Sequence, residues 1–419
     1  MTSLVSVNGA RLTGNLRTLA RFGLNTEGGV DRASFSAADQ EARSWLTSWC
    51  EEHGLRVIVD GIGNMIVSSP ALEQGIADQA PVWSGSHIDA VPNGGRYDGP
   101  LGVLAAIECL TRLQEEKVTL ERPVRAVVYA DEEGNYAHLL GSSALARGFT
   151  VDELSALEGR DGDRFADTFT AAGGDLHAAA DVRLAAGSIH ASVELHIEQG
   201  PVLEREGLDV ANVTGIVAIG GGTLRFLGRA DHAGTTPMNG RQDAVVAMAD
   251  LVTRLPGIAR QVGDTSVVTT GIVKVLPGGS NVIAETAEVV VDYRDPSTEN
   301  ATALGDLIAA AAQDVAHRRG LQVEAHFEPL IPAAPLHETV REAIQASAQE
   351  HGYSSRDLPS GAGHDSQNLA TLAPTGMIFV PSVDGRSHSP AELTHDADIV
   401  RGANVLLGAL MRLASASTA

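Results

Sequence analysis

The stretch VRAVVYADEEG, residues 124–134, joins a near-continuous apolar run to three acidic residues. A strand of a parallel sheet is buried on both faces, so it lacks the alternation of apolar and polar residues seen in a half-exposed strand. Val124–Ala130 therefore predicts a strand inside an α/β sheet. The acidic residues would then lie at the carboxyl end of that strand, where the ligand sites of such sheets gather.

The segments around this strand alternate between helical and extended patterns. Ser36 is a suitable N-cap for a helix that continues through Trp45 and Trp49 and stops at Gly54. A second helix is expected at Leu101–Glu115, where apolar residues recur at helical spacing. Further strands are expected at 55–59, 64–67, 82–86 and 191–197. This alternation predicts an α/β fold, with a largely parallel mixed sheet flanked by helices.

The pattern changes near Val213, which indicates a second structural unit. A chain of 419 residues also exceeds one ordinary hydrophobic core. We expect a larger domain formed by 1–212 and 330–419, and an α+β unit inserted in it at 213–329. The insert is expected to hold strands at 213–219, 223–227, 266–275 and 287–293 and helices at 243–255 and 301–318. After it we expect helices at 338–351 and 396–413 and a strand at 377–380. The run Gly220–Gly222 predicts a turn or a close approach of two chain segments.

The overall charge and the cysteines narrow the class of protein. A net charge of −23 disfavours nucleic acid and anionic membranes as partners, while one or two local arginines still permit a small anionic substrate. No apolar run approaches the roughly 20 residues that cross a bilayer, and Met1–Leu12 does not look like a secretory signal. Cys50 and Cys109 are interpreted as buried free thiols. A cytoplasmic location is therefore expected.

Several segments place metal-capable side chains next to predicted strand ends. In GSHIDAVPNGGRYDG, residues 85–99, His87 ends a strand and the glycines let the chain fold back so that Asp98 can return beside it. Asp89 can accept the second imidazole N–H and fix the tautomer of His87. The alternative interpretation is a glycine-rich turn whose polar groups are all satisfied.

Three more segments follow the same pattern. In DEEG, residues 131–134, neighbouring carboxylates point in different directions, so one can bind a metal while the next faces the attacking water. ELHIEQG, residues 194–200, carries His196 near a strand end, and GRSHSPAE, residues 385–392, carries His388 in a loop. Acidic runs are more often solvated turns, and single histidines more often have no special role. Four such clusters together favour a metal site.

The order of these segments resembles the dinuclear-zinc aminoacylase and carboxypeptidase family, in its amidase branch. That branch holds N-carbamoyl-L-amino acid hydrolases, allantoate amidohydrolases and fungal-type beta-ureidopropionases. The resemblance covers nearly the whole chain. It is carried by the four segments above and by GRADHAGTTPM at 228–238, GGSNVI at 278–283, DYRDP at 292–296 and SGAGHDSQ at 360–367.

The resemblance implies that 1–212 and 330–419 form the catalytic domain and that the insert at 213–329 is a lid or dimerisation domain. It also implies a site with two metal ions. Asp98 would bridge them, His87 and His196 would complete one site, and Glu133 and His388 would complete the other. Glu132 would be the general base that activates a metal-bridging water, with Asp89 as a further catalytic residue. Zn²⁺ is the expected ion, while Mn²⁺, Co²⁺ or Ni²⁺ also suit such ligands. A histidine at position 196 favours the amidase branch, because peptidase branches typically have a carboxylate there.

The resemblance also implies residues that bind substrate. Arg294 would grip a substrate carboxylate, for which its guanidinium fork is suited, although a salt bridge with a flanking aspartate is the alternative. Asn281 would hydrogen-bond the same end, and Gln199 is a candidate at the ureido end. His232 would stabilise the oxyanion, often in the site of a neighbouring subunit, which implies a homodimer.

These residues predict a metal-dependent amidohydrolase that cleaves a carbamoyl or ureido C–N bond of a small carboxylate substrate of the N-carbamoyl-L-amino acid type. Allantoate is the closest alternative substrate. A second alternative is an N-acyl amino acid hydrolase or carboxypeptidase on the same scaffold, and a third is a metal-binding relative without activity. The chain departs from close relatives at 135–142, where they usually have an Arg-Phe pair and a longer loop. It also departs at 217–222, where they place a polar side chain. Both departures concern the substrate and leave the metal ligands unaffected.

Overall fold

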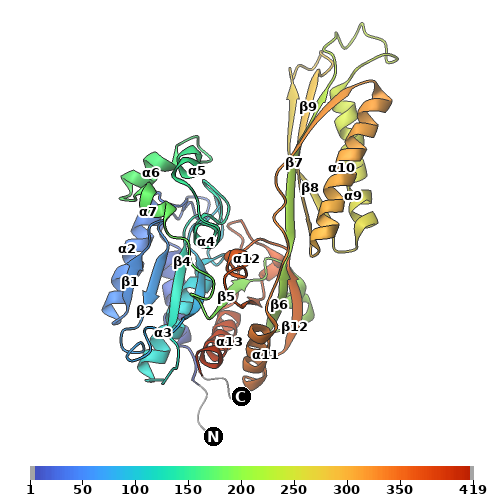
Figure 1. The fold of residues 1–419 in the computed structure, drawn as a ribbon. Coiled ribbons are helices and arrows are strands. Elements are labelled where there is room, and N and C mark those ends of the chain that lie inside the picture. Colours follow the sequence, from blue (N-terminus) through green and yellow to red (C-terminus); the bar gives the residue numbers. More distant parts are fainter. Residues whose placement is uncertain (1–4, 416–419) are drawn as a thin grey trace. The chain divides into compact units, whose positions relative to one another are not determined.

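The structure is a computed structural model that describes residues 5–415, and its internal contacts divide the chain into two compact units (Figure 1). Unit 1 comprises the described residues before Gly215, Pro335–Leu358 and the described residues from His364 on. Unit 2 comprises Gly215–Ala334 and Pro359–Gly363. The two units are described separately below.

The larger sheet is a mixed sheet with a parallel centre. Its nine strands have the order β1-β2-β4-β3-β5-β13-β6-β11, and β12 pairs with β6. Strands β4, β3, β5 and β13 are parallel, whereas β1, β2 and β6 join antiparallel. The strands are β1 (Arg56–Val59), β2 (Met65–Ser68), β3 (Val82–His87), β4 (Val124–Tyr129), β5 (Ala191–Ile197), β6 (Val210–Ile216), β11 (Ala334–Pro335), β12 (Ser355–Ser360) and β13 (Thr375–Val380). The expected α/β fold is confirmed.

Helices cover both faces of this sheet. One face packs against α1, α2, α3, α11 and α13 in the main apolar core, and smaller clusters that include α4 to α7 and α12 lie elsewhere in unit 1. Every residue of β3, β5 and β13 is buried, as expected for strands covered on both faces. The helices of unit 1 are α1 (Gly9–Leu19), α2 (Ala37–Glu52), α3 (Pro100–Glu115), α4 (Leu140–Ala146), α5 (Val151–Ala156), α6 (Phe165–Ala171), α7 (Leu176–Ala180), α8 (Val202–Glu206), α11 (Glu338–Glu350), α12 (Asp365–Leu369) and α13 (Asp396–Ala414), with a short 3₁₀ turn, η1 (Val383–Gly385).

The predicted start of α2 is confirmed, because the Ser36 side chain accepts a hydrogen bond from the backbone N–H of Asp39. Cys50 and Cys109 are buried free thiols, also as expected. Within residues 5–415, no helix has the length and apolar character needed to cross a membrane.

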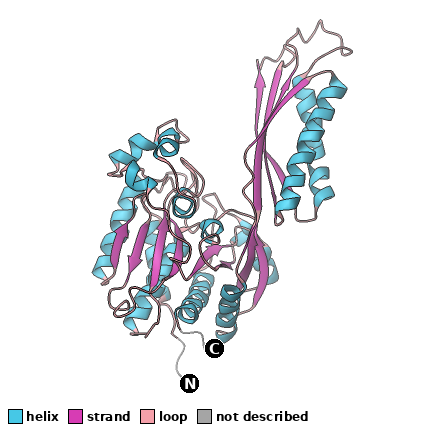
Figure 2. Cartoon of the chain, viewed as in Figure 1, coloured by secondary structure: helices cyan, strands magenta, loops and turns pink. Residues whose placement is uncertain are grey.

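Unit 2 contains a four-stranded antiparallel sheet of order β10-β7-β9-β8. Its strands are β7 (Ala218–Leu227), β8 (Val267–Leu276), β9 (Thr286–Asp295) and β10 (Gln322–Phe327). Helices α9 (Ala244–Val262) and α10 (Thr298–Arg319) cover one face (Figure 2). The core of unit 2 lies between these helices and the inward residues of β7 and β9, such as Leu224, Val289 and Val291.

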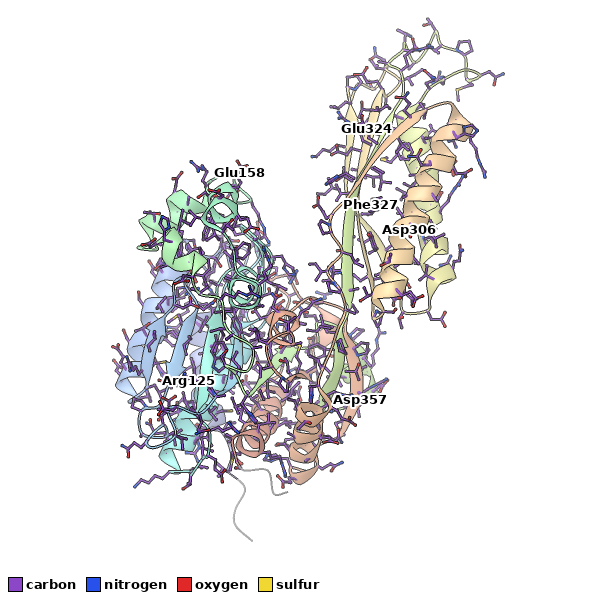
Figure 3. The ribbon with its side chains drawn as sticks, in the orientation of Figure 1. Arg125, Glu158, Asp306, Glu324, Phe327 and Asp357 are labelled. Atoms are coloured by element: carbon purple, nitrogen blue, oxygen red, sulfur yellow. The ribbon has the colours of Figure 1, made fainter. Side chains whose placement is uncertain are left out.

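Two expectations for unit 2 are corrected. The Gly220–Gly222 run lies inside β7 and forms no turn, but it does allow a close approach. A Cβ at Gly220 would lie 2.2 Å from the Tyr293 ring, and one at Gly222 would lie 2.6 Å from the ring of Phe327. Phe327 is labelled in Figure 3. Helix α9 also continues through Pro256 to Val262 instead of ending at residue 255. Its apolar side continues beyond the proline with Ile258, which is buried in the same core.

Candidate metal centre

The predicted metal-capable side chains of unit 1 come together at one edge of the larger sheet. His87 is the last residue of β3 and pairs in register with Tyr129, two residues before Asp131. His196 is the penultimate residue of β5 and pairs with Phe379 of β13. Because these strands are parallel, their carboxyl ends meet at the same edge. The loop after β13 brings His388 to this edge as well.

Asp98 lies at the centre of the cluster. Its Oδ1 is 3.6 Å from His87 Nε2 and 3.0 Å from His196 Nε2. Its Oδ2 is 3.2 Å from His388 Nε2, which is 3.6 Å from Glu133 Oε1. Two groups result, His87–Asp98–His196 and Asp98–Glu133–His388, each with all its ligand atoms within 4.8 Å of one another. The two groups share Asp98, so the geometry allows two ions bridged by one carboxylate.

Gly99 explains how Asp98 can reach His87. Its φ of 80° is unfavourable for residues with a Cβ, and a Cβ there would lie 2.5 Å from the His87 ring. Gly99 is also the N-cap of α3, so the chain enters the helix directly after Asp98. The glycine therefore brings the aspartate loop against the end of β3.

The imidazoles are oriented for metal binding. His87 Nδ1 lies 3.0 Å from the carbonyl oxygen of Asp89, and His196 Nδ1 lies 2.9 Å from that of Ile197. A proton on each Nδ1 can be donated to these carbonyls, which leaves the Nε2 lone pairs free. His196 Nε2 is buried and makes no well-aligned hydrogen bond within residues 5–415, although Asp98 Oδ1 lies 3.0 Å away. With the proton on Nδ1, this lone pair faces a carboxylate oxygen, and a metal ion bound to both atoms would satisfy them.

The carboxylate of Asp89 has a different role from the one expected. The backbone carbonyl of Asp89 accepts the imidazole N–H, whereas its carboxylate Oδ1 is 3.7 Å from His87 Nδ1. The carboxylate instead accepts the backbone N–H groups of Glu132, at 3.4 Å, and Glu133, at 3.1 Å. Asp89 therefore orients the turn that carries the two glutamates.

The charges in the cluster also favour a cation. Burial, assisted by nearby carboxylates, raises the pKa of Glu132 well above its ordinary value and that of Glu133 to about 7. Burial would also raise the pKa of Asp98, but the imidazoles of His196, His388 and His87 outweigh it and hold this pKa well below its usual range. The hydrogen bond with Asp98 raises the pKa of His388 to about 9. A divalent ion would relieve the mutual repulsion of these carboxylates.

Several buried polar residues around the cluster were not assigned a role from the sequence. The carboxylate of Asp131 accepts the backbone N–H groups of Asn135, Tyr136 and Ala137, at 2.8, 2.9 and 3.0 Å, and so shapes the loop after the two glutamates. His364 packs edge-on against His196 with 4.5 Å between ring centroids. Both lay in quoted motifs, but only the fold shows what they contact.

Gln199, predicted to bind substrate, contacts the cluster itself. Its Nε2 donates to Asp98 Oδ2 at 2.7 Å, and its Oε1 is buried without a hydrogen-bond partner in the described part of the chain. The backbone of Gln199 has a positive φ of 57°, and its N–H donates to Ser382 Oγ at 3.0 Å. Gln199 therefore lies beside the metal-capable carboxylate, which keeps it a candidate for the ureido end of a substrate.

Comparison with known proteins identifies the family. The sequence model of peptidase family M20/M25/M40 matches residues 83–412 of this chain. This chain belongs to that family. The N-carbamoyl-L-amino acid amidohydrolase of Geobacillus stearothermophilus is 39% identical over 414 residues, which cover 97% of this chain and 99% of that protein. The ureidoglycolate hydrolase of Arabidopsis thaliana is 32% identical over 99% of this chain and 88% of that protein.

Comparison with solved structures identifies the branch of the M20/M25/M40 family to which this chain belongs. The crystal structure of an amidase of the hydantoinase/carbamoylase family from Burkholderia multivorans matches with a TM-score of 0.88 and 33% identity, over 98% of this chain and 99% of that chain. The chain is therefore a hydrolase of the amidase branch. Members of peptidase family M20/M25/M40 generally bind divalent metals, which agrees with the clusters around Asp98.

The remaining predicted site residues lie in unit 2. His232 and Val282 form a backbone bridge, and Ala233 N donates to the carbonyl oxygen of Asn281 at 3.0 Å, so the His232 and Asn281 segments are adjacent. Arg294, on β9, pairs with Asp292, its Nε lying 2.9 Å from Asp292 Oδ1. This is the salt bridge that the sequence left as an alternative.

Proposed function

We propose that the chain hydrolyses the carbamoyl C–N bond of an N-carbamoyl-L-amino acid. The observation that carries this proposal is the cluster centred on Asp98, with Glu132 beside it and a histidine at position 196. Glu132 Oε2 lies 3.6 Å from His87 Nε2, so the carboxyl group borders the metal-capable atoms. The full-length similarity to an N-carbamoyl-L-amino acid amidohydrolase supports the choice of substrate.

The residues present fit two divalent ions. His87, Asp98 and His196 would hold one, and Asp98, Glu133 and His388 the other, with Zn²⁺ as the expected ion and Mn²⁺, Co²⁺ or Ni²⁺ as alternatives. Bound ions would supply Lewis-acid activation of the scissile carbonyl and would acidify water. Three imidazole and two carboxylate side chains are a donor set that suits this group of metals.

Glu132 would move the protons of the reaction. It takes a proton from the water molecule whose oxygen attacks the carbamoyl carbon, and it delivers this proton to the nitrogen as the C–N bond breaks. The products are the free amino acid and carbamic acid, which decomposes to carbon dioxide and ammonia. The raised pKa of Glu132, caused mainly by its burial, suits a carboxyl group that must both accept and donate a proton.

Recognition of the substrate carboxylate is assigned to unit 2. Arg294 has five N–H donors; Asp292 accepts from Nε and Nη2, and the carbonyl oxygen of Gly361 accepts from Nη1. Within residues 5–415, one N–H on each terminal nitrogen is left without a hydrogen bond and can bind a carboxylate. His232 accepts the backbone N–H groups of Gly234 and Thr235 at Nδ1, so its neutral ring carries the proton on Nε2 as an oxyanion donor requires. Asn281 lies next to it.

A substrate panel tests the proposal. The metal-loaded protein is incubated with N-carbamoyl-L-amino acids, the carboxamide of one of them, allantoate, N-acetyl amino acids and dipeptides, and ammonia and free amino acid are measured. We expect ammonia and amino acid in equal amounts from the N-carbamoyl-L-amino acids, and much less from the carboxamide, which lacks the anionic end. Ammonia from allantoate alone would select that substrate instead. Release of amino acid from acyl compounds without ammonia would contradict the proposal.

A homodimer in the cytoplasm is part of the same proposal. Strand β8 lies at an edge of the unit 2 sheet and exposes apolar side chains, with Val267 at 50%, Ile272 at 51% and Leu276 at 52% exposure. An exposed apolar edge strand is suited to pairing with a second copy. Buried free thiols fit a reducing compartment. Analytical ultracentrifugation should show a dimer at assay concentrations; a fully active monomer would contradict this assignment.

A further inference from the structure

The carboxylate of Glu392 holds the backbone of the loop that carries Asp98. Glu392 is only 4% exposed. Its Oε1 accepts three consecutive backbone N–H groups, from Arg96 at 2.8 Å, Tyr97 at 2.7 Å and Asp98 at 3.2 Å. An ionised carboxylate that accepts several N–H groups forms strong, charge-assisted hydrogen bonds. The position of the Asp98 backbone therefore depends on a residue almost 300 positions further along the chain.

The second oxygen of Glu392 reaches the loop that carries His388. Glu392 Oε2 lies 2.9 Å from the hydroxyl oxygen of Ser387, and the same hydroxyl lies 2.7 Å from Asp98 Oδ2. Ser387 has a single proton, so it donates to one carboxylate at a time. It is followed directly by His388, which has the unfavourable positive φ of 52°. One carboxylate thus contacts two of the three loops that supply side chains to the group Asp98–Glu133–His388.

Gly95 indicates that the place of this carboxylate is built into the fold. A Cβ on Gly95 would lie 2.0 Å from Glu392 Cδ and 2.1 Å from both carboxylate oxygens. The backbone of Gly95 does not have a positive φ, so alanine is compatible with its conformation. The three atoms nearest to such a Cβ all belong to the Glu392 carboxylate.

We propose that Glu392 is a positioning residue of the metal centre. It fixes Asp98 through the backbone of 96–98 and His388 through Ser387, and Gly95 leaves the space that its carboxylate needs. This role rests on the proposed function, because it takes Asp98 and His388 as metal ligands. Groups that orient ligands in this way typically change metal affinity by about 10–100-fold when they are removed.

The test measures metal affinity directly and needs no turnover. The metal-free full-length chain and its variants are titrated with Zn²⁺ in competition with a chelating indicator, and each melting temperature is recorded. Glu392→Ala should weaken Zn²⁺ binding by about 10–100-fold. Glu392→Gln should weaken it less, because the amide oxygen can still accept the three N–H groups. The glutamine variant also keeps the comparison available if the alanine variant does not fold.

A double-mutant cycle with Gly95 separates positioning from general stability. Gly95→Ala should weaken Zn²⁺ binding in the wild-type background, where its Cβ displaces the carboxylate, but by less than about twofold when added to Glu392→Ala. Glu108→Gln is the matched control, because Glu108 is also buried, at 2% exposure, and accepts the backbone N–H of Asn8 at 2.8 Å. It should lower the melting temperature without changing Zn²⁺ affinity.

The outcomes distinguish this role from the proposed function. A wild-type chain that binds no Zn²⁺ would overturn the metal centre itself, and the role of Glu392 with it. Normal Zn²⁺ binding by both the wild type and Glu392→Ala would overturn only the role of Glu392. An equal effect of Gly95→Ala with and without Glu392 would likewise contradict it, since the glycine would then be needed for another reason.

Discussion

The variant Glu132→Gln is expected to lose turnover by roughly 10²–10⁴-fold, the usual contribution of a general acid and base, while both metal ions stay bound. Glutamine has nearly the shape of glutamate but cannot accept and return the proton. Removing the charge of Glu132 removes an attraction to His87 and a repulsion with Glu133. Glu132 is not itself one of the proposed ligands, so the candidate ligands should keep their places. The measurements are kcat on an N-carbamoyl-L-amino acid and the metal content per chain by elemental analysis.

Glu133→Gln is the matched control for this experiment. It changes the next residue in the same way, but Glu133 is a candidate ligand whose Oε1 lies 3.6 Å from His388 Nε2. The control should lose at least one ion. Metal loss in Glu132→Gln with retention in Glu133→Gln would reverse the two roles.

The variant Asp98→Asn is expected to lose both ions and all measurable turnover. The two oxygens of Asp98 face different groups, Oδ1 toward His87 and His196 and Oδ2 toward His388. Asparagine offers one oxygen and no charge, so it cannot serve both groups. Any stabilisation by metal should disappear as well, which is about 2.7 kcal/mol for a single site at a free metal concentration of 100 times Kd.

Metal content and thermal unfolding with and without added Zn²⁺ test this prediction. Asp243→Asn is a suitable control: Asp243 caps α9 in unit 2, and asparagine is an equally good N-cap. The control should keep its metal and its Zn²⁺-dependent rise in melting temperature. Retention of two ions by Asp98→Asn would show that Asp98 is not the shared ligand.

The parts of the fold that depend on local pattern could be predicted from the sequence. The apolar run before Asp131 is recognisable as an interior strand, Ala191–Ile197 as a strand, and Ser36 as a helix cap. Strand β10 was missed because most of its residues are exposed, so it has no apolar signature. The glycine run in β7 was ambiguous for a related reason: its close contacts are with Tyr293 and Phe327, which are distant in sequence.

The candidate site shows the same limit. Ligand-capable residues could be assigned because histidines and acids stand next to strand ends, and because the motifs resemble a known family. In Asp89, the backbone carbonyl and not the carboxylate accepts the hydrogen bond from the His87 ring. This detail follows from backbone geometry that no motif encodes. The role proposed for Glu392 depends on contacts across 294 to 296 residues, which only the folded chain brings together.

The central claim is that Asp98 and four side chains around it, His87, His196, Glu133 and His388, hold two ions and leave Glu132 free as the base. A crystal structure of the Zn²⁺-loaded protein, with anomalous difference maps on both sides of the zinc absorption edge, tests it most directly. We predict two zinc peaks about 3.5–4 Å apart, one beside His87 and His196 and the other beside Glu133 and His388, with Asp98 touching both. A single peak, or a zinc ion held instead by Glu194, His196 and His364, would contradict the account.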